Sequence, residues 1–437
     1  MQLKRTLGLR DLVLTGIILV QPTAPMPLFG VVQHKAQGHV VTTILIAMVA
    51  MLFTAISYGR MARAYPSAGS AYTYVGQEIH SALGYATGWS MLMDYILNPL
   101  ICTIWCSKAA MNIVPAIPYL AWTLFFAGLF TFMNLQRIEA TARTNTALAV
   151  AMGLVILAVL VLTVRYVLGI TGIGAASFFT RPFYDPATFK FSNVAAGTSL
   201  AVLTYIGFDG ISTLSEEVRN PRRNVLIAMV LVCLTIGVLS AIEVYAAQLV
   251  WPAKEAFPDV DTAYVHFAGR IGGPILFQLV NLTLLVASIG SGGGGQLAGA
   301  RLLYGMGRDR ALPPSFFGYL HSRTQIPSRN VMLIGAICLI GAWMISYETG
   351  AELLNFGALI GFMGVNAAAF LRYFVRGERT LSHFIVPVLG FVICLAIWLS
   401  LRDLAKIAGI TWLTAGVLYG AWKTKGFREP IRFETGQ

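Results

Sequence analysis

The sequence predicts an all-α polytopic membrane protein with twelve transmembrane helices, ten of which form two inverted repeats of five. Hydrophobic residues make up 57% of the 437 residues and charged residues only 11%, whereas soluble proteins contain roughly 25% charged residues. The apolar runs are long and do not alternate, which indicates helices rather than a barrel. Two of these runs are broken near their middles, at matching positions in the two halves of the chain.

Twelve apolar segments are long enough to span a membrane. They lie near residues 11–32, 40–59, 84–113, 117–134, 144–168, 194–214, 224–250, 264–298, 329–347, 350–371, 383–401 and 404–422. The first segment has no small-residue cleavage site of the kind found in signal peptides, so we expect it to remain as a helix.

The segments fall into two sets of five and a final pair. We expect a first five-helix repeat over 11–168, a second over 194–371, and peripheral helices 11 and 12 over 383–422. Because each set has an odd number of spans, the second set enters the membrane from the opposite side, as an inverted repeat requires. The glycine run 292–295 in segment eight predicts close packing against segment one, with a flexible gate as the alternative.

The net charge of +12 follows the predicted topology. With both termini in the cytoplasm, most of the 31 Lys and Arg residues fall on the cytoplasmic side, as the positive-inside rule requires. We therefore expect a multi-pass protein of the plasma (inner) membrane, embedded in the lipid bilayer, with no nucleic-acid partner. The five cysteines lie within spans and the six histidines in loops or at span ends, without metal-ligand spacing. This pattern predicts no disulfide framework, metal site or cofactor.

The two broken segments predict the position of a binding site. The first is interrupted over residues 21–27, which include three prolines, and the second over residues 205–210, which include two glycines. Backbone N–H and C=O groups that leave a helix at membrane depth must be buried in protein or line a cavity. Matching breaks in the two repeats of a transporter commonly mark the place where substrate binds.

Three acidic residues lie well inside predicted spans: Asp94, Asp209 and Glu243. Ionisable groups inside a membrane are costly and are functional by default. A buried acid without a nearby cation can bind and release a proton, so we expect Asp209 and Asp94 to couple transport to protons. A structural hydrogen bond, to the unwound backbone for Asp209 or between helices for Asp94, is the alternative. Glu243 lies near the outer end of its span, where it could reach the interface, so we expect a structural role for it.

Two further acids, Glu216 and Glu217, follow the second break and precede three arginines between residues 219 and 223. A salt-bridged inner gate is one interpretation of this pattern. A solvated helix end is an equally ordinary one.

The first break favours an amine over a carboxylate. Prolines have no N–H, so this turn offers more free carbonyl groups than donors. A substrate carboxylate is usually held by clustered N–H groups at the N-terminus of a half-helix, whereas aromatic faces assist the binding of a cation. The predicted substrate-binding residues come from both breaks and from segments three and eight: Gln21, Pro22, Thr23, Ala24, Pro25, Asp94, Tyr95, Tyr205, Phe208, Asp209 and Ser288.

Several stretches resemble the amino acid–polyamine–organocation (APC) superfamily of permeases. Segment six with its exit, residues 205–221, looks like the corresponding segment of that family. The stretches similar to its putrescine importer branch are 53–59, 69–74, 88–95, 301–309 and 355–359. The resemblance implies a LeuT-like arrangement of ten core helices and alternating access, with substrate held between segments one, three, six and eight.

The resemblance also implies roles for individual residues. Asp209 falls where relatives carry an acid linked to proton coupling, and Asp94 falls where several carry a glutamate. Segment one departs from the pattern, because members that transport amino acids usually have a Gly-Ser-Gly-type turn where this chain has Gln21 to Pro25. That departure weakens the case for recognition of an α-amino acid.

The predicted function is secondary active transport of a small amine-bearing solute, as proton-coupled uptake of a polyamine such as putrescine or of a cationic amino acid. A neutral amino acid permease of the same fold is the first alternative. Sodium coupling stays open, because Ser288 and its neighbour Ser291 could supply oxygen ligands near segment one. A channel or a membrane enzyme would need a polar pore face or a clustered nucleophile and base, which the sequence does not show.

Overall fold

The computed structural model describes residues 7–66, 70–136, 142–169, 176–215, 218–308, 312–322 and 324–427. Within these residues the chain is nearly all helical, and each predicted apolar segment corresponds to one helix or to one broken pair. The helices of the first half are α1 (Leu9–Val20), α2 (Phe29–Ala36), α3 (Val40–Ala64), α4 (Ser70–Glu78), α5 (Ser81–Met111), α6 (Tyr119–Leu135), α7 (Ala142–Leu168) and α8 (Ala176–Thr180).

The second half begins with another broken element and ends with two helices at the edge of the bundle. Its elements are α9 (Phe191–Ala201), the 3-10 turn η1 (Val202–Tyr205), α10 (Gly210–Thr213), α11 (Pro221–Val250), α12 (Ala263–Arg308), α13 (Pro314–Phe317), α14 (Ser328–Met344), α15 (Tyr347–Phe370), the π-helical turn η2 (Leu371–Val375), α16 (Leu381–Leu399) and α17 (Asp403–Lys423).

Length and composition make this a polytopic membrane protein. Among the described residues, eight helical stretches are long and apolar enough to cross a membrane, and α6 and α14 are shorter apolar helices. Many large hydrophobic side chains remain exposed on α6, α7, α16 and α17, as a surface in contact with lipid requires. All five cysteines are buried and free.

Both predicted breaks are present. The first helix ends at Val20 and α2 begins at Phe29, with turns between them. The second break starts earlier than predicted, because α9 already ends at Ala201 and tightens into η1 before the turns that precede α10.

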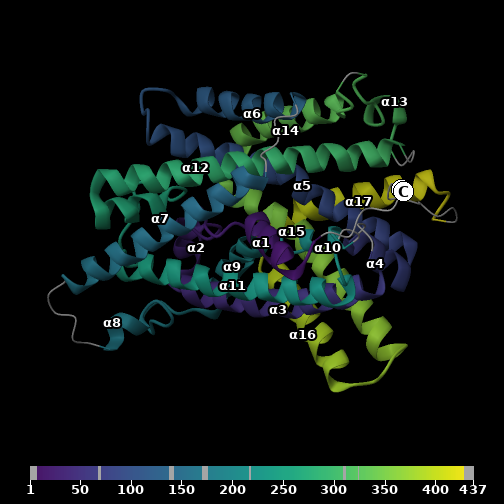
Figure 1. Cartoon of the computed structure of the whole chain (residues 1–437), viewed down its shortest axis with the longest axis horizontal. Coiled ribbons are helices and arrows are strands. Elements are labelled where there is room, and N and C mark those ends of the chain that lie inside the picture. Colours follow the sequence, from purple (N-terminus) through teal and green to yellow (C-terminus); the bar gives the residue numbers. More distant parts are fainter. Residues whose placement is uncertain are drawn as a thin grey trace.

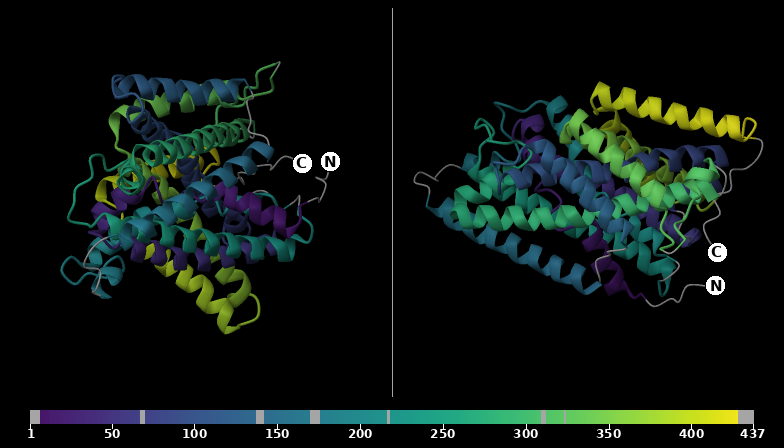
Figure 2. Two further views of the ribbon diagram at one scale, coloured as in Figure 1. Left: turned by 60° about the vertical axis from the view of Figure 1, so that its left-hand side comes forward. Right: turned by 90° about the horizontal axis from the view of Figure 1, so that it is seen from above.

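The broken helices lie in the middle of the bundle. Figure 1 shows α1, α2, α9 and α10 surrounded by α12 and α7 on one side and by α11 and α3 on the other, with α6 and α14 forming one edge and α16 the opposite edge. In Figure 2, α1 begins and α17 ends at the same end of the molecule. Close approach of α1 to its neighbours depends on Gly16, where a Cβ atom would lie 2.5 Å from Cδ1 of Ile211 and 2.7 Å from Cγ2 of Val232.

The glycine run in α12 remains helical and packs against a different partner from the one predicted. A Cβ atom at Gly292 would lie 2.6 Å from the ring of Phe130, and one at Gly295 would overlap Oδ1 of Asn98. The partners are therefore α6 and α5, and the prediction of packing against segment one is wrong. The irregular position in α12 is Gly273, which has a φ of 69° and directly precedes Pro274. Proline cannot continue the helical hydrogen bonds there.

Candidate functional site

The two predicted proton-coupling acids lie close together although they are far apart in the sequence. Asp94 projects from the middle of α5, and Asp209 ends the second break. Each is 8% exposed, and the two carboxyl groups are close enough to interact electrostatically. No Lys, Arg or His in the described part of the chain forms an ion pair with either acid. The pair therefore forms an electronegative centre without a counter-ion.

The turns around Asp209 hold its carboxyl group in place. The amide of Gly207 donates a hydrogen bond to Oδ1 of Asp209 at 3.3 Å. Gly207 has a φ of 113°, a conformation that glycine adopts without strain. A Cβ atom at this position would lie 3.1 Å from the carbonyl oxygen of Leu19, so the second break packs directly against the end of α1.

The second break has fewer free carbonyl groups than the sequence suggested. Successive turns use the carbonyls of Tyr205, Gly207 and Phe208 as acceptors for amides three residues later, and the carbonyl of Asp209 likewise accepts from the Ser212 amide. We expected the freed carbonyls of this break to face the cavity. The backbone pairs with itself in tight turns instead, because unpaired groups at membrane depth are costly.

The first break keeps the imbalance that its prolines predict. The amides of Gln21, Ala24 and Met26 donate to backbone carbonyls within the turn or α1. Since residues 22, 25 and 27 are prolines, only the Thr23 amide remains among residues 21–27. By contrast, the carbonyls of Pro22, Ala24 and Pro25 accept no hydrogen bond from any residue that the structure describes.

Side chains of the first break reach neighbouring helices. Nε2 of Gln21 donates to the carbonyl oxygen of Ala287 in α12 at 3.1 Å, which places Ser288 beside the contact between the first break and α12. Thr23 is 1% exposed, and its hydroxyl lies 3.9 Å from Sδ of Met152 in α7. Ser288 is 8% exposed.

The three predicted aromatic residues have different environments. Tyr95 interacts electrostatically with both acids of the pair. Tyr205 is fully buried, and its hydroxyl donates to the carbonyl oxygen of Ile44 in α3 at 2.8 Å. Phe208 is also fully buried, with its ring centroid 5.3 Å from that of Phe362 in α15. Tyr95 thus lies beside the acids, whereas the contacts of the other two rings are with the surrounding helices.

Sequence reasoning missed Tyr58 as a member of this site. Its ring packs against Phe208 at 5.6 Å, its buried hydroxyl has no partner among the described residues, and it interacts electrostatically with Asp209. The signal was present, because Tyr58 lies in the 53–59 stretch that carries the family resemblance. Only the packing of α3 against the second break shows that its hydroxyl lies near Asp209.

The predicted inner gate, Glu216 and Glu217, lies outside the described residues. Contacts on either side of it join α10 to α4, and the segment that follows it to the chain just before α1. The hydroxyl of Ser70 at the start of α4 lies 2.9 Å from that of Ser212 in α10, and the Arg219 amide donates to the carbonyl of Leu7 at 2.8 Å.

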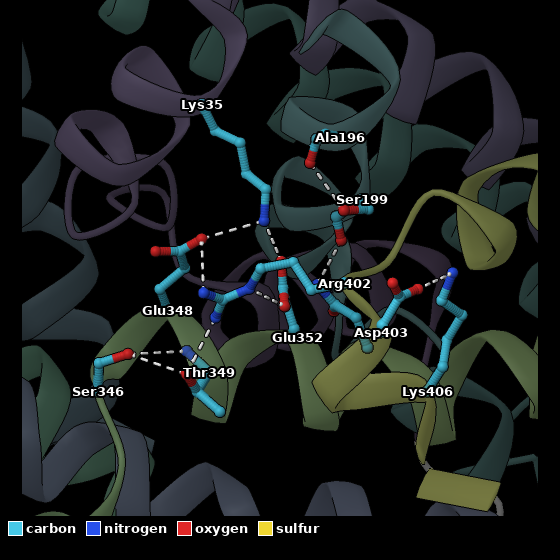
Figure 3. A network of polar contacts seen from close by, with 11 residues as sticks. Lys35, Ala196, Ser199, Ser346, Glu348, Thr349, Glu352, Arg402, Asp403 and Lys406 are labelled. Carbon is cyan, nitrogen blue, oxygen red and sulfur yellow. Dashed lines mark hydrogen bonds and ion pairs between the residues drawn. The ribbon is translucent and has the colours of Figure 1, made fainter. Parts of the chain in front are cut away.

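At the other end of the bundle, an ion-pair network joins α2 to α15 and α17 (Figure 3). Nζ of Lys35, in the last turn of α2, pairs with Glu348 at 3.0 Å and with Glu352. Arg402, which precedes α17, donates from Nε to Oε2 of Glu352 at 2.6 Å and from its terminal nitrogen to Thr349 at 2.9 Å. The Glu352 side chain is fully buried. Sequence reasoning missed this network, because each residue stands near a span end where charges are common.

A second network joins α4 to the end of α15. Glu78 is 3% exposed, accepts a hydrogen bond from the Tyr65 hydroxyl at 2.7 Å, and pairs with Arg376 at 3.0 Å and with Arg372. Ion pairs therefore join helices at both ends of the bundle, while Asp94 and Asp209 in its middle have no ion-pair partner among the described residues.

Comparison with known proteins agrees with this architecture. The amino acid permease family matches residues 26–428. The chain is 34% identical to the low-affinity putrescine importer PlaP of Escherichia coli K12, over 98% of this chain and 96% of the relative. It is 26% identical to the branched-chain amino acid permease BcaP of Lactococcus lactis, over 94% of this chain and 93% of the relative. It is also 26% identical to the vacuolar cationic amino acid transporter 4 of Arabidopsis thaliana, over 85% and 64% of the two chains.

Proposed function

Since this chain belongs to the amino acid permease family, we propose that it is a secondary active transporter that takes up a small organic amine, with putrescine as the best candidate. The family and these relatives are transporters and not enzymes. Transport proceeds by alternating access through twelve spans, with the inverted five-helix repeats at 11–168 and 194–371 moving around the broken helices. Both termini lie in the cytoplasm, and the protein resides in the inner membrane.

The uncompensated acid pair is the observation that carries this proposal. Asp94 and Asp209 are buried, interact with each other and have no ion-pair partner among the described residues. Two carboxyl groups without a counter-ion are costly unless a cation or protons neutralise them. A protonated amine satisfies this requirement, and Tyr95 and Tyr58 supply aromatic faces beside it.

The first break supports an amine that carries no carboxylate. Its free carbonyls can accept hydrogen bonds from an ammonium group, whereas one remaining N–H, that of Thr23, offers little to a carboxylate. The putrescine importer of E. coli aligns over nearly the whole length of both chains, which is consistent with this preference. A cationic amino acid is the second candidate, favoured by the likeness to the plant transporter.

Proton coupling completes the proposal. One carboxyl group of the Asp94 and Asp209 pair binds a proton while the other balances the ammonium group of the substrate. Proton and amine are released together on the cytoplasmic side, so that the inward proton gradient drives uptake. Sodium coupling would instead place an ion near Ser288, where the first break meets α12 through Gln21.

Uptake into proteoliposomes tests the substrate with matched pairs of solutes. Putrescine and ornithine differ by one carboxylate, as do agmatine and arginine, so each pair isolates the effect of that group. We expect saturable, pH-gradient-driven uptake of labelled putrescine, competition by agmatine, and little competition by ornithine. Transport of alanine without transport of putrescine would establish a neutral amino acid permease instead. Uptake that depends on a sodium gradient at constant pH would show that sodium, and not the proton, is the coupling ion.

A further inference from the structure

A further buried acid lies outside the substrate site and has no hydrogen-bond partner among the described residues. Glu243 projects from the half of α11 nearer to α12, and its side chain is fully buried. We expected a structural role for this residue, since it stands near the outer end of its span and could reach the interface; the structure buries it instead. Both carboxyl oxygens are enclosed and accept no hydrogen bond from any residue that the structure describes.

Two unpartnered hydroxyl groups belong to the same region. The Tyr264 hydroxyl, in the first turn of α12, is enclosed without a hydrogen bond and interacts electrostatically with Glu243. The hydroxyl of Ser240 is likewise enclosed without a partner, and it stands three residues before Glu243 on the same face of α11. No charged group in the described part of the chain interacts with Glu243, and Tyr264 is the titratable group that faces it from a packed element.

These groups form a site for a small positive charge. A bare carboxylate without hydrogen bonds in an apolar interior is strongly unfavourable, and such groups become neutral or bind a cation. A protonated carboxyl group needs one acceptor for its O–H. The hydroxyls of Tyr264 and Ser240 make no hydrogen bond to Glu243 in this structure, so a small side-chain movement is needed for either of them to accept from it. The site is too poor in oxygen atoms for a metal ion that prefers six or more of them.

Access to this site depends on the outer half of the first broken helix. The ring of Tyr264 packs edge-on against Phe29, the first residue of α2, with centroids 5.8 Å apart. The next residue, Gly30, lies so close to the start of α12 that a Cβ atom would overlap the carbonyl oxygen of Val260 and lie 2.5 Å from Cβ of Ala263. A shift of α2 away from α12 would remove this cover from Tyr264 and admit water to Glu243.

We propose that Glu243, with the hydroxyls of Tyr264 and Ser240, is a second proton-binding site whose contact with water is opened and closed by the packing of α2 on α12. This site differs from Asp94 and Asp209, because it lies between α11 and α12 and neither acid interacts with it. The proton exchanges with the solution when α2 separates from α12, and it remains bound when they pack. The inference goes beyond the proposed function, since it holds whatever solute the protein transports.

Infrared spectroscopy of the full-length protein in lipid vesicles tests the site without any substrate. A protonated carboxyl group has a carbonyl stretch distinct from that of a carboxylate, and transfer to D2O shifts it when the proton exchanges. We expect a slowly exchanging carboxyl band that is absent from Glu243→Gln and retained in an Asp94→Asn/Asp209→Asn double variant. Loss of the band in the double variant but not in Glu243→Gln would overturn the proposal.

Exchange rates then test control by α2. Gly30→Ala adds a methyl group at the contact with α12, and we expect its Glu243 band to exchange at least about tenfold faster than in the wild type. Gly416→Ala on α17, which crowds Trp89 of α5 instead, is the matched control and should leave the rate unchanged. If Gly30→Ala does not fold, Phe29→Leu loosens the same contact.

Two other outcomes would also refute the proposal. Equal exchange rates in the wild type and both α2 variants would make Glu243 a structural carboxyl group that α2 does not control. Loss of the band when sodium replaces choline, at constant pH, would make the site one for a monovalent metal ion rather than for a proton.

Discussion

The ion-pair network around Glu352 gives a prediction that tests how α2 is held. Glu352 is fully buried between Lys35 and Arg402, whereas the Arg402 side chain is 38% exposed. Removal of one partner from a buried pair costs about 3–5 kcal/mol. Because Glu348 and Thr349 can still bind the two cations, we expect Glu352→Gln to lower the free energy of unfolding by about 3 kcal/mol and Arg402→Met by about 1 kcal/mol.

A double-mutant cycle measures the interaction itself. We expect Lys35→Met and Glu352→Gln together to cost about 1–3 kcal/mol less than the sum of the two single changes, because residues in one network are coupled. Unfolding in detergent micelles, at low and high salt, provides the free energies. The exposed pair of Lys406 and Asp403 is the control, since the Asp403 side chain is 90% exposed and its coupling should stay below about 1 kcal/mol. A Lys35–Glu352 coupling no larger than that of this control would refute the reasoning.

Four further predictions concern the acids and the glycine run. Asp209→Asn should abolish uphill uptake in proteoliposomes and retain some solute exchange; unchanged accumulation with normal pH dependence would remove Asp209 as proton carrier. Asp94→Asn should raise the KM for putrescine at least about tenfold, because the lost interaction between the carboxylate and the ammonium group corresponds to about 1.4 kcal/mol or more. Asp94→Glu should keep the KM close to the wild-type value. Equal KM values for Asp94→Asn and the wild type would place Asp94 outside the site. Burial, Asp259 and Glu348 raise the pKa of Asp261, between α11 and α12, to about 6 against the opposing effect of Lys108. The folded state thus binds more protons than the unfolded state between about pH 4 and 6, so ionisation of Asp261 lowers the free energy of unfolding as pH rises through that window. Asp261→Asn should therefore stabilise the protein at neutral pH by roughly 1–3 kcal/mol and have little effect near pH 4. A Tm difference between variant and wild type that does not depend on pH would contradict this. Gly295→Ala should lower stability by about 1–3 kcal/mol because its methyl group would overlap Oδ1 of Asn98, and Asn98→Ala should relieve part of that cost; additive effects would show that the two positions do not touch.

The local sequence was sufficient to predict the membrane helices of this protein. Long apolar runs predict membrane helices because every backbone polar group in lipid must be paired within the segment, and the described helices follow those runs closely. The break at residues 21–27 was also predictable, since prolines remove the donors that a continuous helix needs. The second break was harder to delimit, because no proline marks the point where α9 tightens into η1.

Contacts across the bundle were not predictable in the same way. The glycine run of α12 permits close packing against any neighbour, and only the structure identifies α5 and α6 as the partners. Glu243 and Glu352 stand near span ends, where a charge in the sequence is equally consistent with solvent. Both are fully buried in the structure: Glu243 accepts no hydrogen bond from any described residue, and Glu352 lies between two cations.

The sequence by itself determined the membrane class, the helices, the two breaks and the residue types available for an amine, because these depend on composition and on groups a few residues apart. Tertiary structure decided which of those groups act together. Asp94 and Asp209 form a pair, Tyr58 joins them, and Lys35 reaches Glu352 only because helices distant in the chain pack side by side. Burial and charge balance arise from all the neighbours of a residue, and these neighbours are set by the packing of the whole bundle.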